Sequence, residues 1–380
     1  MLGTDVGRAL VREAVRAPRA PRTSNLARAR EYNVGRGQAG GTPGCRGEVA
    51  VPEESVITPA ANDVTQPPKP ATELAGDMGG QPASPVLLVR QPKMDGARLL
   101  NQSFRFIGGL GVWPDDHSKV AASLYAASTH GKDPKTHLPV FPYRPRFFFT
   151  SDEGGSGKTR LNKATALICH DPVSLIESSK AGFIGMIRKY RTVIVTELDN
   201  WVGPTGRRNS WLLGIGNAGY EPGHVHTHKE SGQEVEIDLF GDMMLDGLAK
   251  VIYNTGNNLT TFVSRAVIVW VRRAPEGYRA PRITKQVRAF ADDGKMRLAA
   301  WMQQEIEDGL EDDEPDMSGL PGNRPGALWE PLIMVADRAG GEWPELAREA
   351  CLHLESPAGK TATTLKAIEE ADRKLDEWGF

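Results

Sequence analysis

The chain is 380 residues long, which is enough for two domains or for one large domain with tails. Its 46 basic and 48 acidic side chains give a formal net charge of −2, so no overall positive field recruits nucleic acid or a membrane surface. The three cysteines are widely separated, which argues against a disulfide framework or a zinc ribbon. No apolar run approaches the roughly 20 residues of a membrane span, so the sequence predicts a soluble, cytoplasmic protein with no membrane partner.

Residues 1–86 are rich in Arg, Pro, Gly and Ala and poor in large apolar side chains. Such a composition cannot bury enough apolar surface to offset the entropy of ordering, so we predict a disordered tail over this range. Nine arginines among the first 46 residues could contact nucleic acid or an acidic partner. A solvated tail explains the same composition more simply, and an organelle transit peptide is a further alternative.

Residues 87–144 have the pattern of a helical lead-in. Two helices are predicted on either side of Trp113-Pro114, with Asp115 favouring the N-terminus of the second. The apolar run PRFFFTS, residues 145–151, then predicts a buried strand, and LNKATALICH resumes helical spacing. A strand, a glycine-rich loop and a helix in this order are the context that a phosphate-binding loop requires.

Further short β-branched runs follow at 192–199, 250–257 and 265–273, separated by helical patterns. Such runs indicate an α/β fold with a parallel sheet covered by helices on both faces. The alternation in HVHTHKESGQEVEIDLF, with its central turn, predicts a β-hairpin insertion at 224–240. The predicted parts after the lead-in are an α/β core that contains the glycine-rich loop, 145–300, an acidic linker, 301–326, and a helical C-terminal segment, 327–380.

The stretch TSDEGGSGKTR nearly matches the phosphate-loop pattern G-x-x-x-x-G-K-[ST], with Asp152 in place of the first glycine. Glycines let backbone N–H groups converge on an anion, Lys158 would reach the β- and γ-phosphates, and Thr159 would place its hydroxyl on Mg²⁺. We therefore predict an ATP and Mg²⁺ site in a P-loop NTPase similar to ring ATPases. The alternative is a degenerate loop that binds nothing. The predicted nucleotide-binding residues are Gly154, Gly155, Ser156, Gly157, Lys158, Thr159, Arg160 and Asn254.

Hydrolysis needs carboxylates at the end of the strand beside the loop, and TVIVTELDN offers two. Glu197 stands where a water-activating glutamate belongs, and Asp199 could support Mg²⁺ through a water molecule. The metal-side aspartate of the usual pattern is replaced by Thr196, so nucleotide binding is more secure than hydrolysis. A surface acidic pair is the alternative interpretation of Glu197 and Asp199.

Two more polar residues are predicted near the phosphates. Asn254, at the tip of the run 250–257, could sense the γ-phosphate, and Arg265 could reach the phosphates of its own or a neighbouring subunit. A plain structural role explains each of them equally well. The predicted catalytic residues are thus Glu197, Lys158 and Arg265, and the predicted metal-site residues are Thr159 and Asp199.

Several stretches resemble the domain-of-unknown-function family 3631, namely TSDEGGSGKTR, VTELDNWVGP, GNAGYEPG, SRAVIVWVRR and LWEPLIMVADRAGGEWPELAREA. The resemblance extends over about 95–352. It implies a P-loop ATPase of phages and mobile genetic elements, often beside primase-type modules, and hence a helicase-like role in DNA replication. The family's loop tends to lack the first glycine, as here, whereas its second motif usually reads D-E-x-D, from which Thr196 departs.

His224, His226 and His228 alternate along one predicted strand of the hairpin and so share a face. They could bind Zn²⁺ or Ni²⁺, although no cysteine or carboxylate completes an obvious tetrahedral set. The hairpin could instead line the pore of a ring helicase and contact the DNA backbone, or it could simply be exposed to solvent.

The sequence leaves two functions open. The first is an ATP-driven motor on DNA that works as a homo-oligomer, for which a hexameric ring is one arrangement. The second is a nucleotide-binding switch or replication accessory factor with little or no hydrolysis, which Thr196 and the near-neutral charge favour. A small-molecule kinase is a weaker alternative, because no lid or acceptor pocket is recognisable.

Overall fold

The computed structural model describes residues 93–189, 191–203, 208–251 and 259–356. The prediction for the tail 1–86 therefore lies outside the described residues. Within the described ranges, no helix combines the length and the apolar character needed to cross a membrane.

A parallel five-stranded sheet forms the centre of the fold, and its strand order is β2-β3-β6-β1-β7. The strand that precedes the glycine-rich loop, β1, pairs with β6 on one side and β7 on the other, and all six of its residues are buried. Parallel strands need long crossovers, which the helices provide. The strand bounds are Arg146–Ser151 for β1, Pro172–Leu175 for β2, Thr192–Val195 for β3, Met243–Leu248 for β6 and Ala266–Trp270 for β7.

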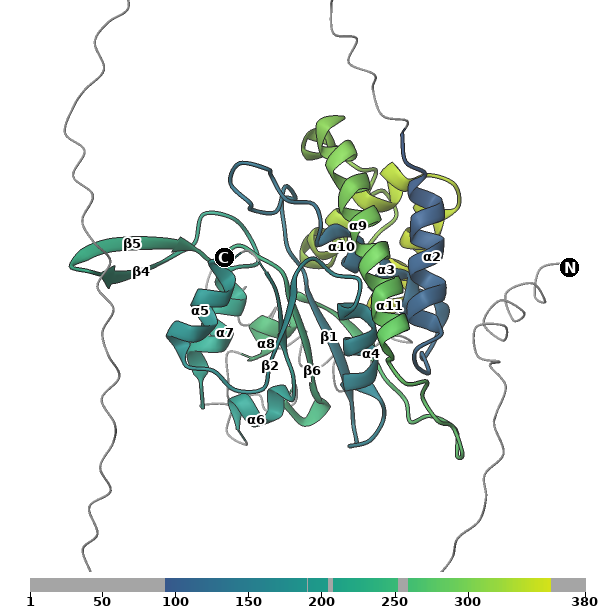
Figure 1. Cartoon of the computed structure of the whole chain (residues 1–380), viewed down its shortest axis with the longest axis horizontal. Coiled ribbons are helices and arrows are strands. Elements are labelled where there is room, and N and C mark those ends of the chain that lie inside the picture. Colours follow the sequence, from purple (N-terminus) through teal and green to yellow (C-terminus); the bar gives the residue numbers. More distant parts are fainter. Residues whose placement is uncertain (1–92, 190, 204–207, 252–258, 357–380) are drawn as a thin grey trace, which may run out of the picture. The chain divides into compact units, whose positions relative to one another are not determined.

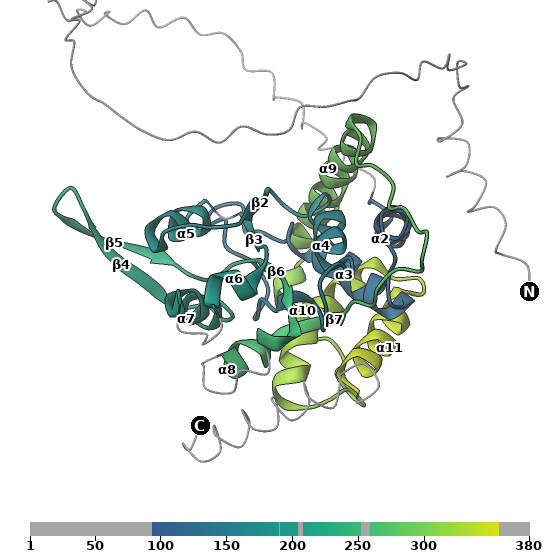
Figure 2. The same ribbon diagram turned by 90° about the horizontal axis from the view of Figure 1, so that it is seen from below.

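Two hydrophobic clusters cover the two faces of the sheet, because successive side chains of a strand point to opposite faces. Phe147 and Phe149 pack into one cluster, and Phe148 packs into the other. Figures 1 and 2 show helices on both faces of the sheet. The predicted α/β class, with a parallel sheet flanked by helices, is confirmed.

The larger cluster unites the helical lead-in with the C-terminal helices. Its helices are α2 (Gly96–Gly108), α3 (Asp116–Ser128), α4 (Lys158–Ala166), α9 (Lys285–Glu307), α10 (Asn323–Ala339) and α11 (Trp343–Glu355). The smaller cluster is built on α5 (Lys180–Ile187), α6 (Leu198–Val202), α7 (Ser210–Ala218) and α8 (Leu259–Val263). As predicted, Asp115 caps α3, accepting a hydrogen bond from Ser118 N at 2.7 Å. Gly340-Gly341 lies between α10 and α11.

Of the residues 250–257, where a strand was predicted, the structure describes only Lys250 and Val251, and these two belong to a 3₁₀ turn. The segment MMLDGL forms β6, and a 3₁₀ turn at Ala249–Val251 follows it. Asp246 and Gly247 interrupt the apolar run in β6, so the sequence pattern favoured the following residues. Asn254, the predicted phosphate sensor, lies outside the described residues.

The predicted acidic linker, 301–326, is largely structured. Helix α9 continues to Glu307, and α10 begins at Asn323. Glu305 is fully buried and accepts a hydrogen bond from Trp301 Nε1 at 2.9 Å, while Arg338 of α10 binds both Glu305 and Asp313. The acidic residues therefore hold two helices together instead of separating two parts of the chain.

The predicted hairpin is confirmed as β4 (Val225–Glu230) paired with β5 (Gln233–Asp238). Ser231 and Gly232 form the turn with φ angles of 52° and 86°, as a two-residue hairpin turn requires. Both views show the hairpin projecting from the body of the fold (Figures 1 and 2).

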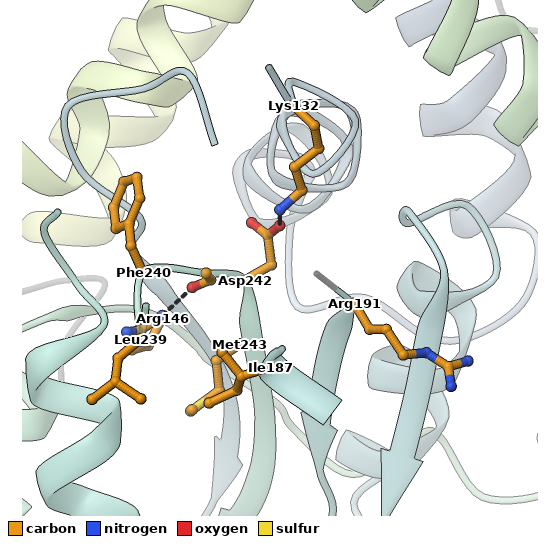
Figure 3. Close-up of a pocket in the computed structure, with 9 residues that line it drawn as sticks. Lys132, Arg146, Ile187, Arg191, Leu239, Phe240, Asp242 and Met243 are labelled. Carbon is orange, nitrogen blue, oxygen red and sulfur yellow. Dashed lines mark hydrogen bonds and ion pairs between the residues drawn. The ribbon is translucent and has the colours of Figure 1, made fainter. Parts of the chain in front are cut away.

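A buried ion cluster lies at the edge of the sheet where the parallel strands begin. The carboxylate of Asp242, just before β6, binds both Lys132 and Arg144 from the α3–β1 connection. Arg146 donates to the carbonyl oxygens of Gly216 and Gly241 at 2.9 and 2.5 Å beside a pocket of about 10 Å³ (Figure 3). That volume suits roughly one water molecule. The cluster therefore stabilises the connection against the sheet and leaves no room for a larger ligand.

His130, between α3 and this ion cluster, makes the stability depend on pH. Burial lowers its pKa from 6.5 to about 4, although its Nε2 lies 2.9 Å from the carbonyl oxygen of Ile168. Below pH 6.5 the unfolded chain binds a proton that the folded chain refuses, so the free energy of unfolding should fall by about 3 kcal/mol between pH 6.5 and 4. Denaturant unfolding measured at several pH values in this range should show that the free energy of unfolding falls less with decreasing pH in His130→Gln than in the unaltered chain. An unchanged dependence of the free energy of unfolding on pH would contradict the assignment of this effect to His130.

Candidate nucleotide-binding site

The glycine-rich loop, residues 152–157, connects β1 to α4 at the edge of the sheet where the parallel strands end. Ligands of open parallel sheets bind at this edge, close to the point where the chain changes direction along the sheet. Here the chain passes from β6 across β1 to β7. Gly155 and Gly157 have φ angles of 77° and 102°, which favour glycine. No side chain caps the N-terminus of α4, so its first N–H groups can serve an anion.

Ser156 in the loop and Lys158 just after it are both held by hydrogen bonds to nearby groups. Ser156 is buried and donates a hydrogen bond to Ser151 Oγ at 2.7 Å, which in turn donates to the carbonyl oxygen of Glu153 at 2.9 Å. Lys158 is also buried, and its Nζ donates to the same carbonyl oxygen at 3.4 Å. The lysine therefore points back over the loop, where a phosphate would have to lie.

A buried carboxylate on β6, that of Asp246, organises the site. Its Oδ1 accepts a hydrogen bond from Thr159 Oγ1 at 2.8 Å and one from the backbone N–H of Glu197 at 3.3 Å. Its Oδ2 accepts one from Asn162 Nδ2 at 2.7 Å. Asp246 thus connects the hydroxyl predicted to bind Mg²⁺ with the glutamate predicted to activate water. No strand was predicted at Met243–Leu248, so Asp246 is not among the predicted site residues.

Glu197 lies at the end of β3 in the left-handed conformation, with φ of 56° and ψ of 52°. Side chains other than glycine rarely adopt this conformation, and where they do the site is often functional. Its carboxylate is exposed and accepts a hydrogen bond from Asn200 Nδ2 at 2.7 Å. The structure therefore places Glu197 beside the loop, as the sequence pattern predicted.

The other two positions of the TELD segment have different partners. Thr196 is buried, and its hydroxyl donates to the carbonyl oxygen of Leu175 on β2 at 3.2 Å. Asp199 accepts a hydrogen bond from the backbone N–H of Leu248 at 3.2 Å. Neither is bonded to Thr159. The geometry therefore favours Asp246 over Asp199 as the carboxylate of a metal site.

Arg160 does not point into the loop. Its Nε donates to the carbonyl oxygen of Leu110 at 2.7 Å, and its Nη2 donates to that of Pro281. The guanidinium thus holds the segment after β7 against the end of α2. The structure therefore places the Arg160 guanidinium against backbone carbonyls, and its contact with a nucleotide stays a prediction.

Arg265 lies at the opposite edge of the sheet from the loop. Strand β7 runs parallel to β1, with Ala266 beside Arg146, so the residue before β7 lies where β1 begins. Arg265 donates to the carbonyl oxygen of Thr261 at 3.0 Å, and its guanidinium lies 5.6 Å from the ring centre of Tyr220. It cannot reach phosphates bound to its own loop, which corrects that part of the prediction.

The charges and the histidines of the hairpin bear on the alternatives that the sequence left open for it. Glu234, Glu236 and Asp238 share its outer face with one lysine, Lys229, and such a face repels phosphate groups. The rings of His226 and His228 stack with centres 6.2 Å apart. In the described part of the chain, which includes all three hairpin histidines, no group of three ligating side chains could hold a metal ion. The charges favour a basic partner over DNA.

Two comparisons relate the chain to known sequences. A family model described as "Protein of unknown function (DUF3631)" matches residues 271–370, which supports placing this part of the chain in that domain family. The matched range begins after β7 and does not include the loop, so the resemblance over about 95–352 is supported only for its later part.

A curated relative from Saccharopolyspora erythraea, "Uncharacterized 28.9 kDa protein in xis 5'region", is 44% identical over 87 residues. These residues are 23% of this chain and 32% of the relative, so the chain spans about a third of the length of the relative it matches. The relative's title describes no activity.

Proposed function

We propose that this chain binds ATP and Mg²⁺ at the loop 152–157 and hydrolyses the nucleotide in the course of work on nucleic acid. The observation that carries the proposal is the hydrogen bond of 2.8 Å between Thr159 Oγ1, at the start of α4, and the buried carboxylate of Asp246. A hydroxyl and a carboxylate at the uncapped N-terminus of a helix suit a metal-bound polyphosphate better than they suit a packing role.

The oxygen donors present fit Mg²⁺, which prefers hydroxyl, carboxylate, water and phosphate oxygens. Thr159 would hold the ion directly, and Asp246 would accept hydrogen bonds from its water ligands. When bound, the ion would neutralise charge that develops on the phosphates. Built at Gly154 and Gly157, a Cβ atom would meet nothing within 4 Å, so the loop borders open space that phosphates could fill.

Glu197 is the proposed group that orients the attacking water. Its carboxylate lies at the end of β3, and its backbone N–H and the Thr159 hydroxyl share one acceptor, Asp246 Oδ1. Asn200 holds that carboxylate at 2.7 Å and leaves it exposed. A carboxylate positioned beside the terminal phosphate accepts a proton from water as the water attacks.

The proposed nucleic-acid contact is the segment that joins β7 to α9, and not the hairpin. Its exposed side chains include four arginines against one acid, Glu276, and Tyr278 is 42% exposed. Arginines bind the phosphate backbone, and an exposed aromatic ring can stack on a base. The arginines are Arg272, Arg273, Arg279 and Arg282. The resemblance to ATPases of phages and mobile elements makes DNA the expected partner and a homo-oligomer the expected assembly.

A nucleotide-dependent switch with negligible turnover is the second candidate. It is favoured by Thr196, whose hydroxyl is bound to β2 and supplies no carboxylate at the usual position. In that case ATP would order the loop and the adjoining arginine segment without being consumed.

Lys158→Ala should weaken binding of Mg·ATP by about 100-fold or more, because a buried ammonium group directed over the loop would be lost. Titration with a fluorescent ATP analogue measures this loss. The matched control is Lys163→Ala on the exposed side of α4, which should change affinity less than about twofold. DNA-stimulated phosphate release then separates motor from switch. Equal affinities of the two variants, or no binding by the unaltered chain, would refute the proposal.

A further inference from the structure

The chain leaves β7 directly beside the glycine-rich loop. The backbone N–H of Val271 donates to the carbonyl oxygen of Thr150 at 2.7 Å, so the next residues emerge where β1 ends. Arg273 places Nη2 3.8 Å from Glu153 Oε2. The same nitrogen lies 3.8 Å from the position that a Cβ on Gly155 would occupy. A guanidinium from β7 therefore borders the loop within the same chain.

Glu153 has a separate group for each of the two cations that border the loop, Lys158 and Arg273. Its carbonyl oxygen accepts from Lys158 Nζ at 3.4 Å, and its carboxylate faces Arg273. The side chains of Glu153 and Arg273 are 60% and 63% exposed, so their ion pair is weak and easily exchanged. A terminal phosphate carries more charge than a carboxylate and accepts two parallel hydrogen bonds from a guanidinium, so it can displace Glu153.

We propose that Arg273 binds the terminal phosphate of a nucleoside triphosphate held by its own loop, and that Glu153 is the resident anion which this phosphate displaces. The inference rests on the proposed function and adds a preference for nucleoside triphosphate over diphosphate. A diphosphate lacks the group that Arg273 would bind, so Arg273 selects triphosphate over diphosphate. Because Arg273 lies in the arginine segment proposed to contact nucleic acid, the nucleotide state also changes the charge available on that surface.

The test is equilibrium binding of Mg·ADP and of Mg²⁺ with an unreactive ATP analogue to the full chain. Arg273→Ala should weaken triphosphate binding about tenfold and diphosphate binding less than twofold. The matched control is Arg272→Ala, since Arg272 is equally exposed and has no ion pair within the described ranges. It should leave both affinities within about twofold. Thermal unfolding of each variant checks that the fold is intact.

Glu153→Gln supplies a second, independent readout. As a single substitution it should strengthen triphosphate binding about threefold, because Glu153 no longer competes with the phosphate for Arg273. Combined with Arg273→Ala it should have no effect, because Arg273 is then absent. Equal effects of Arg273→Ala and Arg272→Ala, or equal losses for di- and triphosphate, would overturn the assignment of Arg273 alone. Failure of the unaltered chain to bind either nucleotide would overturn the proposed function as well.

Discussion

Replacement of Asp242 by asparagine is expected to lower the free energy of unfolding at pH 7 by about 3–5 kcal/mol. The Asp242 carboxylate is fully buried between Lys132 and Arg144, and the Arg144 side chain is also fully buried. Burial alone would raise the pKa of Asp242, but the two cations outweigh this effect and lower its pKa. The substitution preserves shape and leaves two cations without a buried anion, which is the costly case.

The same cluster predicts an order among variants. Lys132→Met should cost less than Asp242→Asn, because Arg144 still neutralises the carboxylate. Asp116→Asn breaks an exposed ion pair with Lys119 and should cost several-fold less than either. Chemical denaturation of the three variants measures the order. A cost for Asp242→Asn no larger than that for Lys132→Met would show that the carboxylate does not hold both cations.

Acid should remove the contribution of Asp242 as well. Its lowered pKa means that the stabilisation is complete above the unfolded value of about 3.9 and is lost as the pH falls through the folded pKa. The loss associated with His130 begins at higher pH, near 6.5. The free energy of unfolding should therefore fall in two overlapping pH ranges, and His130→Gln should remove only the fall at higher pH.

Local sequence patterns were sufficient for the loop and its flanks. PRFFFTS is apolar on both faces and bounded by proline and glycine, so β1 could be identified without tertiary information. The glycines and Lys158-Thr159 define the turn into α4 by their own conformational and charge properties. The hairpin and the Gly340-Gly341 break follow from equally local signals.

The positions of Asp246 and Glu305 were not predicted, because each carboxylate depends on hydrogen-bond partners that are distant in the sequence. Asp246 is tolerated in a buried strand only because Thr159 and Asn162 donate to it, and they lie more than 80 positions earlier. Glu305 belongs to a helix and not to a linker, because Arg338 and Trp301 bind its carboxylate. Apart from Trp301, which lies four positions before Glu305 in the same helix, no window of neighbouring residues contains these donors.

The part of the Arg265 prediction that concerned its own loop could have been excluded from the direction of the strand. Parallel strands end at one edge of a sheet, so a residue that follows β7 can meet the loop and a residue that precedes it cannot. The run SRAVIVWVRR has arginines at both ends, and the direction of the strand places those that follow it at the edge with the glycine-rich loop, where Arg273 meets Glu153. The end of the strand at which a residue lies is therefore a better guide to whether it can meet the loop than its distance from the loop along the sequence.

Under the proposed function, Asp246→Asn should lower the rate of ATP hydrolysis by about 100-fold or more, because it removes the carboxylate that binds the Thr159 hydroxyl proposed to hold Mg²⁺. The variant should also need a higher Mg²⁺ concentration for half-maximal activity, which a merely structural role would not produce. Phosphate release measured over a range of Mg²⁺ concentrations gives both quantities. Asn162→Ala is the matched control, since it removes another partner of the same carboxylate and should cost only a few-fold.

Thr196 gives the reciprocal experiment. Val195 lies beside Leu245, so Thr196 and Asp246 follow at the same level on neighbouring strands, and Asp246 is one strand closer to β1. If Asp246 replaces the missing aspartate, Thr196→Asp should not raise the activity of the unaltered chain but should restore part of the activity lost in Asp246→Asn. A large gain from Thr196→Asp alone would show instead that the unaltered chain lacks its metal-side carboxylate and acts as a switch.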